Sequence, residues 1–217
     1  MKRQNMVLVC LVACGFLASC ATPLPSSAEL DQLTQTILAQ SFRSEGQAGM
    51  DRLNQDEENL ACSQAQRTGV ELDEKTSEEI QARNLKAVQQ PADGKYLGDW
   101  KQGELIAQDG RGKTWSDQAA ISNGGNCYNC HQISKEELSY GTLGPSLYNY
   151  GKLRGVTNPN SPESKPIVQY TWNKIFNPRA YYACSNMPRF GHKNILTQEQ
   201  IRHVMALLLD PASPVNQ

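Results

Sequence analysis

The chain has 217 residues, 39% of them hydrophobic, and a formal net charge of −1 at pH 7. Once an N-terminal leader is set aside, this length fits one large domain or two small ones. Outside that leader no segment approaches the roughly 20 apolar residues of a transmembrane helix, which excludes a protein with several membrane spans. The charge gives no indication of a nucleic-acid partner, and none is expected.

Residues 1–20 have the pattern of an export signal peptide. A basic start precedes an apolar run from Met6 to Phe16 that is too short to span a bilayer as a stable anchor. The segment ends in "LASC", which resembles the lipobox of bacterial lipoproteins and makes Cys20 the lipidation candidate. A plain signal peptide cut nearby is the alternative. Both interpretations predict a periplasmic protein, and the first predicts one that is lipid-anchored to a membrane.

Residues 21–94 are predicted to form a linker and a helical N-terminal extension. A Ser26-x-x-Glu29 capping box starts the first expected helix. Residues 27–90 hold twelve acidic and six basic residues, whereas residues 91–217 hold ten acidic and thirteen basic ones. A stretch this polar cannot bury a core of its own. We therefore expect it to pack on the second part of the chain, to pack on a partner, or to stay partly unpacked.

Two further segments of the extension have distinct patterns. Residues 42–62 are polar with a few apolar positions, and the expected anchors are Met50, Leu53 and Leu60. Farther along, Thr76-x-x-Glu79 forms a second capping box and predicts a helix that ends before Pro91.

Residues 95–217 form the second predicted domain. The segment "QQPADG" before it is typical of a turn, which places the boundary between residues 94 and 95. The first element of this domain is an expected helix within residues 97–108, with Trp100 and Leu105 as its apolar contacts.

The segment "GGNCYNCHQ" holds Cys127 and Cys130, two residues apart, followed directly by His131. Zinc sites, thioredoxin-like redox sites and c-type haem attachment all use a CxxC pair, and the last adds the adjoining histidine. A zinc site needs about four ligands, usually from two such pairs, but the other candidate cysteines, Cys62 and Cys184, are isolated. A thioredoxin-like site would lie within a βαβ pattern, and none is visible near the motif. The residues favour one covalently bound haem c. In this interpretation the two cysteines form thioether bonds to the haem vinyl groups, and His131 is the proximal iron ligand.

A Gly144-Pro145 turn follows the motif. A metal-bound histidine normally donates its other ring N–H to a carbonyl or a carboxylate. We expect the carbonyl of Pro145 to accept that proton from His131, and a plain surface turn is the alternative.

The second axial ligand is predicted to be Met187. The candidates in the chain are Met50, Met187, Met205, His192, His203 and Cys184. Met187 lies in "CSNMPRFGH", a loop that follows an expected helix ending at Pro178, and Pro188 favours an extended backbone before it. His192 is the remaining alternative. A methionine ligand raises the reduction potential relative to a second histidine and completes the coordination of the iron.

The last expected helix begins at a Thr197-x-x-Gln200 capping box and stops at Pro211. Met205 lies on its apolar stripe and is expected in the core, whereas His203 lies roughly opposite that stripe and is expected in solvent.

Cys62 and Cys184 are the candidates for a disulfide. Of the seven cysteines, two leave with the signal peptide, one is the lipidation candidate and two belong to the haem motif. In an oxidising periplasm the remaining two are expected to pair, and two free buried thiols are the alternative.

The order of helix, CxxCH, Gly-Pro, methionine loop and terminal helix resembles class I cytochromes c across residues 95–210. The expected fold class is therefore mainly α, a class I cytochrome c fold with a helical N-terminal extension. Longer stretches, including "GTLGPSLYNYGKLRG", "ACSNMPRFG" and "LLLDPASPVN", resemble the SoxX subunit of the sulfur-oxidising SoxAX cytochromes. The stretch "FRSEGQAGMDRLNQDEENLACSQ" resembles the N-terminal extension of some SoxX members.

This resemblance implies a SoxA-like cytochrome partner. The complex, an L-cysteine S-thiosulfotransferase, oxidatively joins thiosulfate to a cysteine of a sulfur-carrier protein. The catalytic site is expected on the partner subunit, so no residue of this chain is assigned as catalytic. The chain would accept electrons and pass them to a downstream acceptor. A free periplasmic or membrane-anchored electron carrier is one alternative, and a redox enzyme such as a peroxidase, with an open iron position, is another.

Overall fold

A computed structural model describes residues 24–217 with the exception of Ile121. The predicted signal peptide, residues 1–20, and the lipidation candidate Cys20 therefore lie outside the described residues. No helix in the described part is long and apolar enough to cross a membrane.

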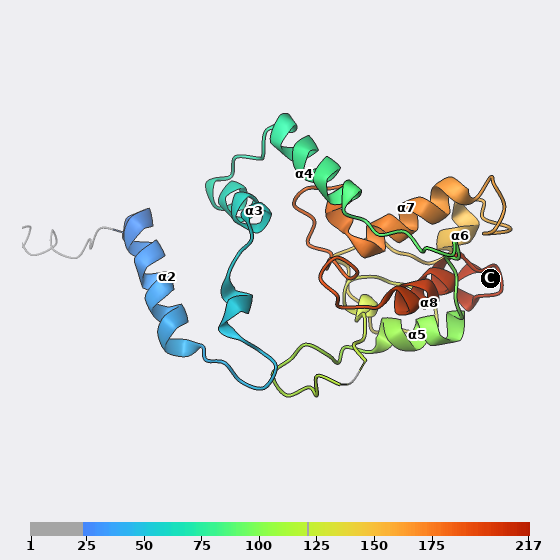
Figure 1. Cartoon of the computed structure of the whole chain (residues 1–217), viewed down its shortest axis with the longest axis horizontal. Coiled ribbons are helices and arrows are strands. Elements are labelled where there is room, and N and C mark those ends of the chain that lie inside the picture. Colours follow the sequence, from blue (N-terminus) through green and yellow to red (C-terminus); the bar gives the residue numbers. More distant parts are fainter. Residues whose placement is uncertain (1–23, 121) are drawn as a thin grey trace, which may run out of the picture. The chain divides into compact units, whose positions relative to one another are not determined.

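The described residues form seven α-helices and four short 3-10 helices, with no β-strand among them (Figure 1). The mainly α class predicted from the sequence is therefore confirmed. The α-helices are α2 (Ser27–Ser41), α3 (Glu57–Thr68), α4 (Glu74–Lys86), α5 (Trp100–Gln108), α6 (Tyr150–Leu153), α7 (Lys165–Phe176) and α8 (Gln198–Leu209). The 3-10 helices are η1 (Met50–Leu53), η2 (Cys127–Asn129), η3 (Pro178–Ala180) and η4 (Pro214–Asn216).

The chain divides into two compact units, one ending at Arg43 and the other spanning residues 44–217. The predicted boundary at residue 94 does not coincide with this division. Residues 44–94 belong to the same compact unit as residues 95–217. Most of the polar extension is therefore packed on the second part of the chain, which is one of the arrangements expected from its composition.

The helix of the first unit, α2, is defined by its cap. The amide of Glu29 donates to Oγ of Ser26 at 3.3 Å, and the Glu29 carboxylate accepts from the Ser26 amide at 2.7 Å. This is the predicted capping box. No residue of α2 is buried. Local capping, and not a hydrophobic core, therefore accounts for where this helix begins.

Helices α5 and α8 pack side by side in the larger unit (Figure 1). Gly103 and Ala107, one turn apart on α5, are buried. A Cβ atom at Gly103 would overlap the backbone carbonyl of His203, so the absent side chain lets the two backbones approach. The prediction that Leu105 is an apolar contact is wrong, because its side chain is 60% exposed. Helix α5 buries its small residues because close helix packing leaves no room for a larger side chain.

Helix α8 begins at the predicted capping box. The Thr197 hydroxyl accepts from the Gln200 amide at 3.2 Å, and the Gln200 side chain accepts from the Thr197 amide at 3.0 Å. Met205 is fully buried, as expected of a core residue. The expectation that His203 is solvated is wrong. Its side chain is only 21% exposed, and its Nδ1 accepts a hydrogen bond from the Asp99 amide at 2.9 Å.

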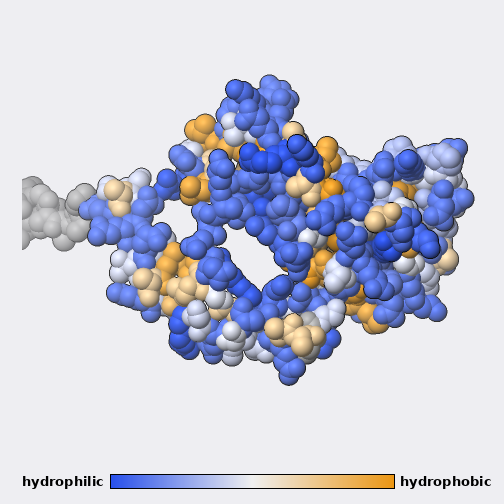
Figure 2. All heavy atoms as spheres, in the orientation of Figure 1, coloured by the Kyte–Doolittle hydropathy of each residue, from blue (hydrophilic) through white to orange (hydrophobic). Residues whose placement is uncertain are grey.

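The segment between α4 and α5 lies over α7. Trp172 of α7 is fully buried, and its Nε1 donates to the carbonyl of Gln89 at 2.9 Å. Tyr96 packs edge-on against the same indole, with ring centroids 5.6 Å apart. Helix α7 itself ends two residues before Pro178, where the sequence predicts it to stop. Outside this core, the face seen in the space-filling view is mostly hydrophilic with small hydrophobic patches (Figure 2).

The extension helices differ from their predicted form in two respects. Met50 and Leu60 are wrong as apolar anchors, because both side chains are exposed, whereas Leu53 is half-buried. Helix α4 is capped by Asp73, whose carboxylate accepts from the Thr76 amide at 2.9 Å. Thr76 therefore lies within the first turn and does not cap the helix, since the earlier aspartate occupies the N-cap position.

Candidate functional site

The CxxCH segment is fixed to the end of α5 by its backbone. The amides of residues 124–126 donate hydrogen bonds of 2.8–3.0 Å to the carbonyls of residues 106, 109 and 111. The carbonyl of Cys127 then accepts from the amides of Cys130 and His131, at 3.1 and 2.9 Å. These bonds close one helical turn at η2. The motif is thereby held as one compact turn, which keeps Cys127, Cys130 and His131 close along the backbone.

Cys127 and Cys130 are both free thiols. Cys127 packs against the hydrophobic core, and its burial raises the pKa of the thiol to about 12, with the neighbouring Cys130 as a smaller cause. A catalytic redox cysteine requires the opposite shift, because the thiolate is the nucleophile. The buried surroundings of Cys127 therefore do not favour a reactive thiolate at this position.

The imidazole of His131 is oriented by the Gly144-Pro145 turn. Nδ1 of His131 lies 2.7 Å from the carbonyl oxygen of Pro145, which is the contact predicted from the sequence. Because a carbonyl can only accept, Nδ1 is the donor of this hydrogen bond, and Nε2 is the ring nitrogen that carries the lone pair in the corresponding neutral tautomer. A Cβ atom at Gly144 would overlap the imidazole ring, so only glycine allows this close approach. The contact thus holds the ring through Nδ1 and makes Nε2 the nitrogen that could bind a metal.

The turn is itself held against the CxxCH segment. The amide of Gly141 donates to the carbonyl of Tyr128 at 2.7 Å, and the amide of Gly144 donates to the carbonyl of Cys130 at 2.8 Å. The Tyr128 hydroxyl donates to Glu104 of α5 at 2.8 Å. Sequence reasoning missed this tyrosine–glutamate pair, since no local pattern links residues 24 positions apart.

Met187 lies outside the regular helices, as predicted. Its side chain is half-buried and packs against the same hydrophobic core as Cys127. Its amide donates to Oγ of Ser185 at 3.3 Å. Among the other ligand candidates, Cys184 forms a disulfide and His203 is engaged by Asp99. These two side chains are therefore engaged elsewhere, and Met187 stays the predicted distal ligand with His192 as its alternative.

His192, the alternative distal ligand, lies near charged side chains. Its burial lowers the pKa of the imidazole, and the positive charges of Arg189 and Lys193 act in the same direction. The backbone amide of His192 donates to the carbonyl of Phe176 at 3.1 Å. The ring is thus neutral at pH 7, beside the ionic cluster described next.

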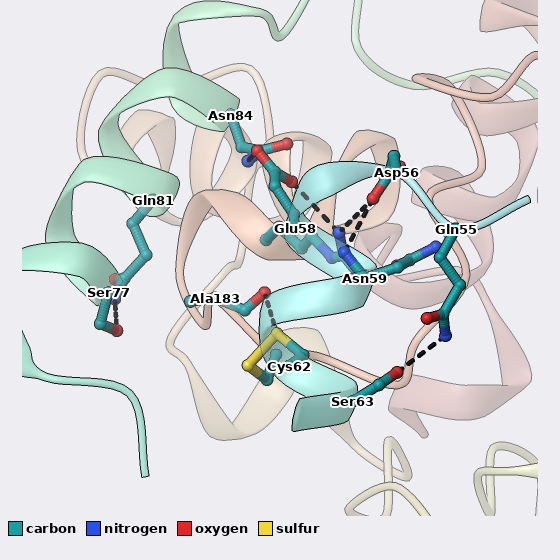
Figure 3. The surroundings of a disulfide bond; sticks show 12 residues. Gln55, Asp56, Glu58, Asn59, Cys62, Ser63, Ser77, Gln81, Asn84 and Ala183 are labelled. Atoms are coloured by element: carbon teal, nitrogen blue, oxygen red, sulfur yellow. Dashed lines mark hydrogen bonds and ion pairs between the residues drawn. A yellow bond between two sulfur atoms is a disulfide. The ribbon is translucent and has the colours of Figure 1, made fainter. Parts of the chain in front are cut away.

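The structure joins Cys62 and Cys184 in a disulfide, with Cα atoms 5.5 Å apart, which confirms the predicted pairing. Figure 3 shows Cys62 on α3, about one turn after Glu58 and Asn59 and nearly two turns after the N-cap Asp56. The bond ties the extension to the loop that carries Met187, because Cys184 precedes it by three residues.

An ionic cluster surrounds the start of α3. The Asp56 carboxylate lies 2.6 Å from Arg189, 3.4 Å from Arg179 and 3.4 Å from Lys193. Glu58 lies 3.1 Å from Arg179. The guanidinium groups of Arg179 and Arg189 are largely buried, so these pairs are better shielded from water than surface salt bridges are.

Both carboxylates of the cluster are held ionised. Burial acts to raise the pKa of Asp56, but hydrogen bonds from Arg189 and the Asn59 amide outweigh it and hold that pKa far below its ordinary value of 3.8. Burial likewise opposes the charge of Glu58, yet its hydrogen bonds keep the pKa below the ordinary 4.5. The donors to Glu58 are Asn84, Arg179 and Arg83.

Sequence reasoning missed this cluster. Its one signal was the opposite charge of the two parts of the chain, since residues 27–90 are acidic on balance and residues 91–217 are basic. That signal predicts attraction between the parts, but it does not identify which side chains pair.

The described residues contain no group of three or more His, Cys, Asp or Glu side chains placed to hold a metal ion. A structural zinc site takes about four such ligands, so the geometry of this part of the chain does not fit one. A haem iron needs only axial ligands from the protein, because the porphyrin supplies the other four. The two free thiols and the oriented His131 therefore fit a c-type haem better than a zinc ion.

Comparison with known proteins gives one relative. No family model matches the chain. The chain is 35% identical over 137 residues to a protein of Aquifex aeolicus (strain VF5) described as an uncharacterized lipoprotein. The match spans 62% of this chain and 61% of the relative, so the chain covers about three fifths of that protein's length.

Proposed function

We propose that the chain is a monohaem c-type cytochrome, the electron-accepting subunit of a SoxAX-like complex that oxidatively conjugates thiosulfate to a carrier-protein cysteine. The observation that carries the haem assignment is the pair of free thiols on one turn with His131. The ring of that histidine is fixed by its 2.7 Å contact with the Pro145 carbonyl. The sulfur-oxidising role rests on the resemblance of the chain to SoxX.

The residues present fit a covalently attached haem. Cys127 and Cys130 would form the two thioether bonds, and Nε2 of His131 would bind the iron. The contact from Pro145 fixes the tautomer of His131 and makes the imidazole a stronger ligand. Met187, packed on the same core as Cys127, would supply the second protein ligand to the iron.

The proposed fold is that of class I cytochromes c, with a helical N-terminal extension. Support comes from the order of α5, the CxxCH turn, the Gly-Pro turn, the Met187 loop and α8. Helix α5 also packs on α8 and contacts η2 of the CxxCH turn.

The conjugation reaction defines what this chain has to do. An S–S bond forms between thiosulfate and the carrier cysteine, and one proton and two electrons are released. A bound haem would supply reversible one-electron transfer, so this chain would accept the two electrons one at a time. The residues of the chain contribute by fixing the ligands and by burying Cys127 in the core. The catalytic site and its nucleophile would lie on the partner subunit.

The proposed location is the periplasm, with a lipid anchor at Cys20. The sequence "LASC" and the lipoprotein description of the Aquifex relative support the anchor.

The test is a gentle purification of the protein from membranes and periplasm. Co-elution of a second c-type cytochrome, with haem reduction that requires both thiosulfate and the carrier protein, is the expected result. A lone chain whose haem stays oxidised would leave only an anchored electron carrier. A chain without covalent haem would overturn the proposal.

A further inference from the structure

Met187 is bracketed by two connections to α3. Cys184, three residues before it, is bonded covalently to Cys62. Arg189, two residues after it, donates to the Asp56 carboxylate at 2.6 Å. Both connections cross more than 100 positions of the sequence, and both end on α3, at its N-cap Asp56 and at Cys62 in its second turn. Figure 3 shows Asp56 and Cys62 on this helix.

The loop between these connections has little support of its own. η3 ends at Ala180 and α8 starts at Gln198, so Met187 belongs to neither. The amide of Met187 makes a hydrogen bond of 3.3 Å to Ser185, longer than the usual 2.7–3.2 Å. Pro188 has no amide to donate. The backbone of Met187 is therefore held mainly through the attachments of Cys184 and Arg189, in addition to the packing of its side chain on the core.

The helix at the other end of these connections is firmly placed. Arg179 of η3 has a side chain only 7% exposed and lies 3.1 Å from Glu58. Glu58 also accepts from Asn84 of α4 at 2.8 Å, and Asn84 accepts from Asn177 at 2.7 Å. Helices α3 and α4 and the start of η3 thus share one largely buried polar network. Loss of one carboxylate from it would leave the buried guanidinium groups of Arg179 and Arg189 with one nearby counter-charge in place of two.

We propose that Asp56, Glu58 and the Cys62–Cys184 disulfide form a clamp that positions Met187 on the haem iron. The inference rests on the proposed function, because it takes Met187 as the distal ligand. It gives the N-terminal extension a specific role. The extension is a brace for one axial ligand, and these residues act through the loop without touching the iron.

The experiment compares variants of the full-length, haem-loaded protein. Asp56→Asn removes the charge at nearly constant shape, and Cys62→Ser/Cys184→Ser removes the covalent connection. Glu57→Gln is the matched control, because Glu57 lies on the same turn of α3 and is exposed. The readouts are the near-infrared absorption band of methionine-ligated ferric haem, the reduction potential and the rate of cyanide binding.

Both clamp variants should keep covalent haem, weaken the methionine band and lower the potential. Cyanide should bind about tenfold faster or more. This change corresponds to a decrease of at least about 1.4 kcal/mol in the stability of the loop conformation that keeps Met187 on the iron. Glu57→Gln should match the wild type, and Asp56→Glu should restore part of the band.

The outcomes separate the clamp from the proposed function. Haem-loaded variants in which all three readouts equal the wild type would overturn the clamp and leave the cytochrome assignment intact. A wild-type chain with haem but no methionine band would overturn Met187 as the ligand and the clamp with it. A chain without covalent haem would overturn the function itself. If Asp56→Asn does not fold, Glu58→Gln and the double serine variant decide between these outcomes.

Discussion

Two different kinds of contact hold the proposed iron ligands His131 and Met187. His131 is fixed locally, by the turn at η2 and by a 2.7 Å contact to a carbonyl fourteen positions away. Met187 lies in a loop whose attachments come from residues more than 100 positions earlier. Loss of ligation should therefore begin at Met187, because disturbing distant contacts does not disturb the local turn at His131.

Replacing Met187 with alanine should leave haem attached but lower the reduction potential and open the iron to small ligands, because a sulfur ligand is lost. Carbon monoxide binding to the reduced protein and a redox titration would measure both effects. Met50→Ala is the control, since Met50 is exposed on η1 and outside the proposed site. A spectrum and potential equal to the wild type would show that Met187 is not the ligand.

Replacing Gly144 with alanine should displace His131 from the Pro145 carbonyl, because the new methyl group would overlap the imidazole. We expect a loss of about 1–3 kcal/mol in the free energy of unfolding, typical of overpacked sites. Thermal unfolding of the haem-loaded protein would measure it. An unchanged melting temperature with unchanged histidine ligation would mean that the turn and the ring are not in contact.

Among the helices, α5 and α8 show the clearest dependence on small side chains. Gly103→Ala should destabilise the fold by about 1–3 kcal/mol or more, because the added Cβ meets the backbone of α8 and not a flexible side chain. Urea unfolding would give the change. Gln102→Ala is the control, since Gln102 is exposed on the same helix and its replacement is expected to be nearly neutral. Equal destabilisation by both would contradict the close packing.

The two carboxylates at the start of α3, Asp56 and Glu58, should make the free energy of unfolding depend on pH in the acidic range. The pKa values of Asp56 and Glu58 are lowered in the folded state, so their contribution is complete above the unfolded-state values near 4. It is lost as the pH falls below those values, since the unfolded chain then binds more protons. Urea unfolding between pH 6 and about pH 3 should show falling stability. In the Asp56→Asn/Glu58→Gln variant the free energy of unfolding should fall less steeply with decreasing pH than in the wild type. An equal slope in the two proteins would show that these carboxylates do not cause the pH dependence.

For the whole molecule, the Cys62–Cys184 bond connects residues 122 positions apart, inside a unit that spans Ser44–Gln217. The acidic extension and the basic second part meet at the Asp56 cluster, so covalent and ionic attachment coincide at one place. An extension too polar to form its own hydrophobic core can therefore be attached to the rest of the chain by a disulfide and ion pairs.

The Cys62→Ser/Cys184→Ser variant should lose about 4–5 kcal/mol in the free energy of unfolding, the value that chain entropy assigns to so long a loop. Urea denaturation of matched samples would test this. Alkylation of both cysteines in the native protein without reductant, detected by mass spectrometry, would contradict the bond itself.

Features that depend on neighbouring residues could be predicted from the sequence. The caps of α2 and α8, the end of α7 and the Pro145 contact of His131 each involve residues within about fourteen positions, so their patterns are visible along the chain. The disulfide was also predictable, because elimination left two cysteines unassigned. The sequence by itself thus determined the mainly α class, the candidate haem motif and one distant covalent pair.

Only the tertiary structure decided which surfaces meet. Helix α5 buries Gly103 and exposes Leu105 because α8 approaches so closely that only a small residue fits between the helices. Hydrophobicity alone would predict a buried Leu105 and an exposed Gly103. Asp56 pairs with Arg189 and Glu58 with Arg179, each more than 120 positions away in the sequence. Pairing at that distance is set by the packed arrangement of the helices and leaves no local pattern, so the clamp on the Met187 loop is a property of the folded chain.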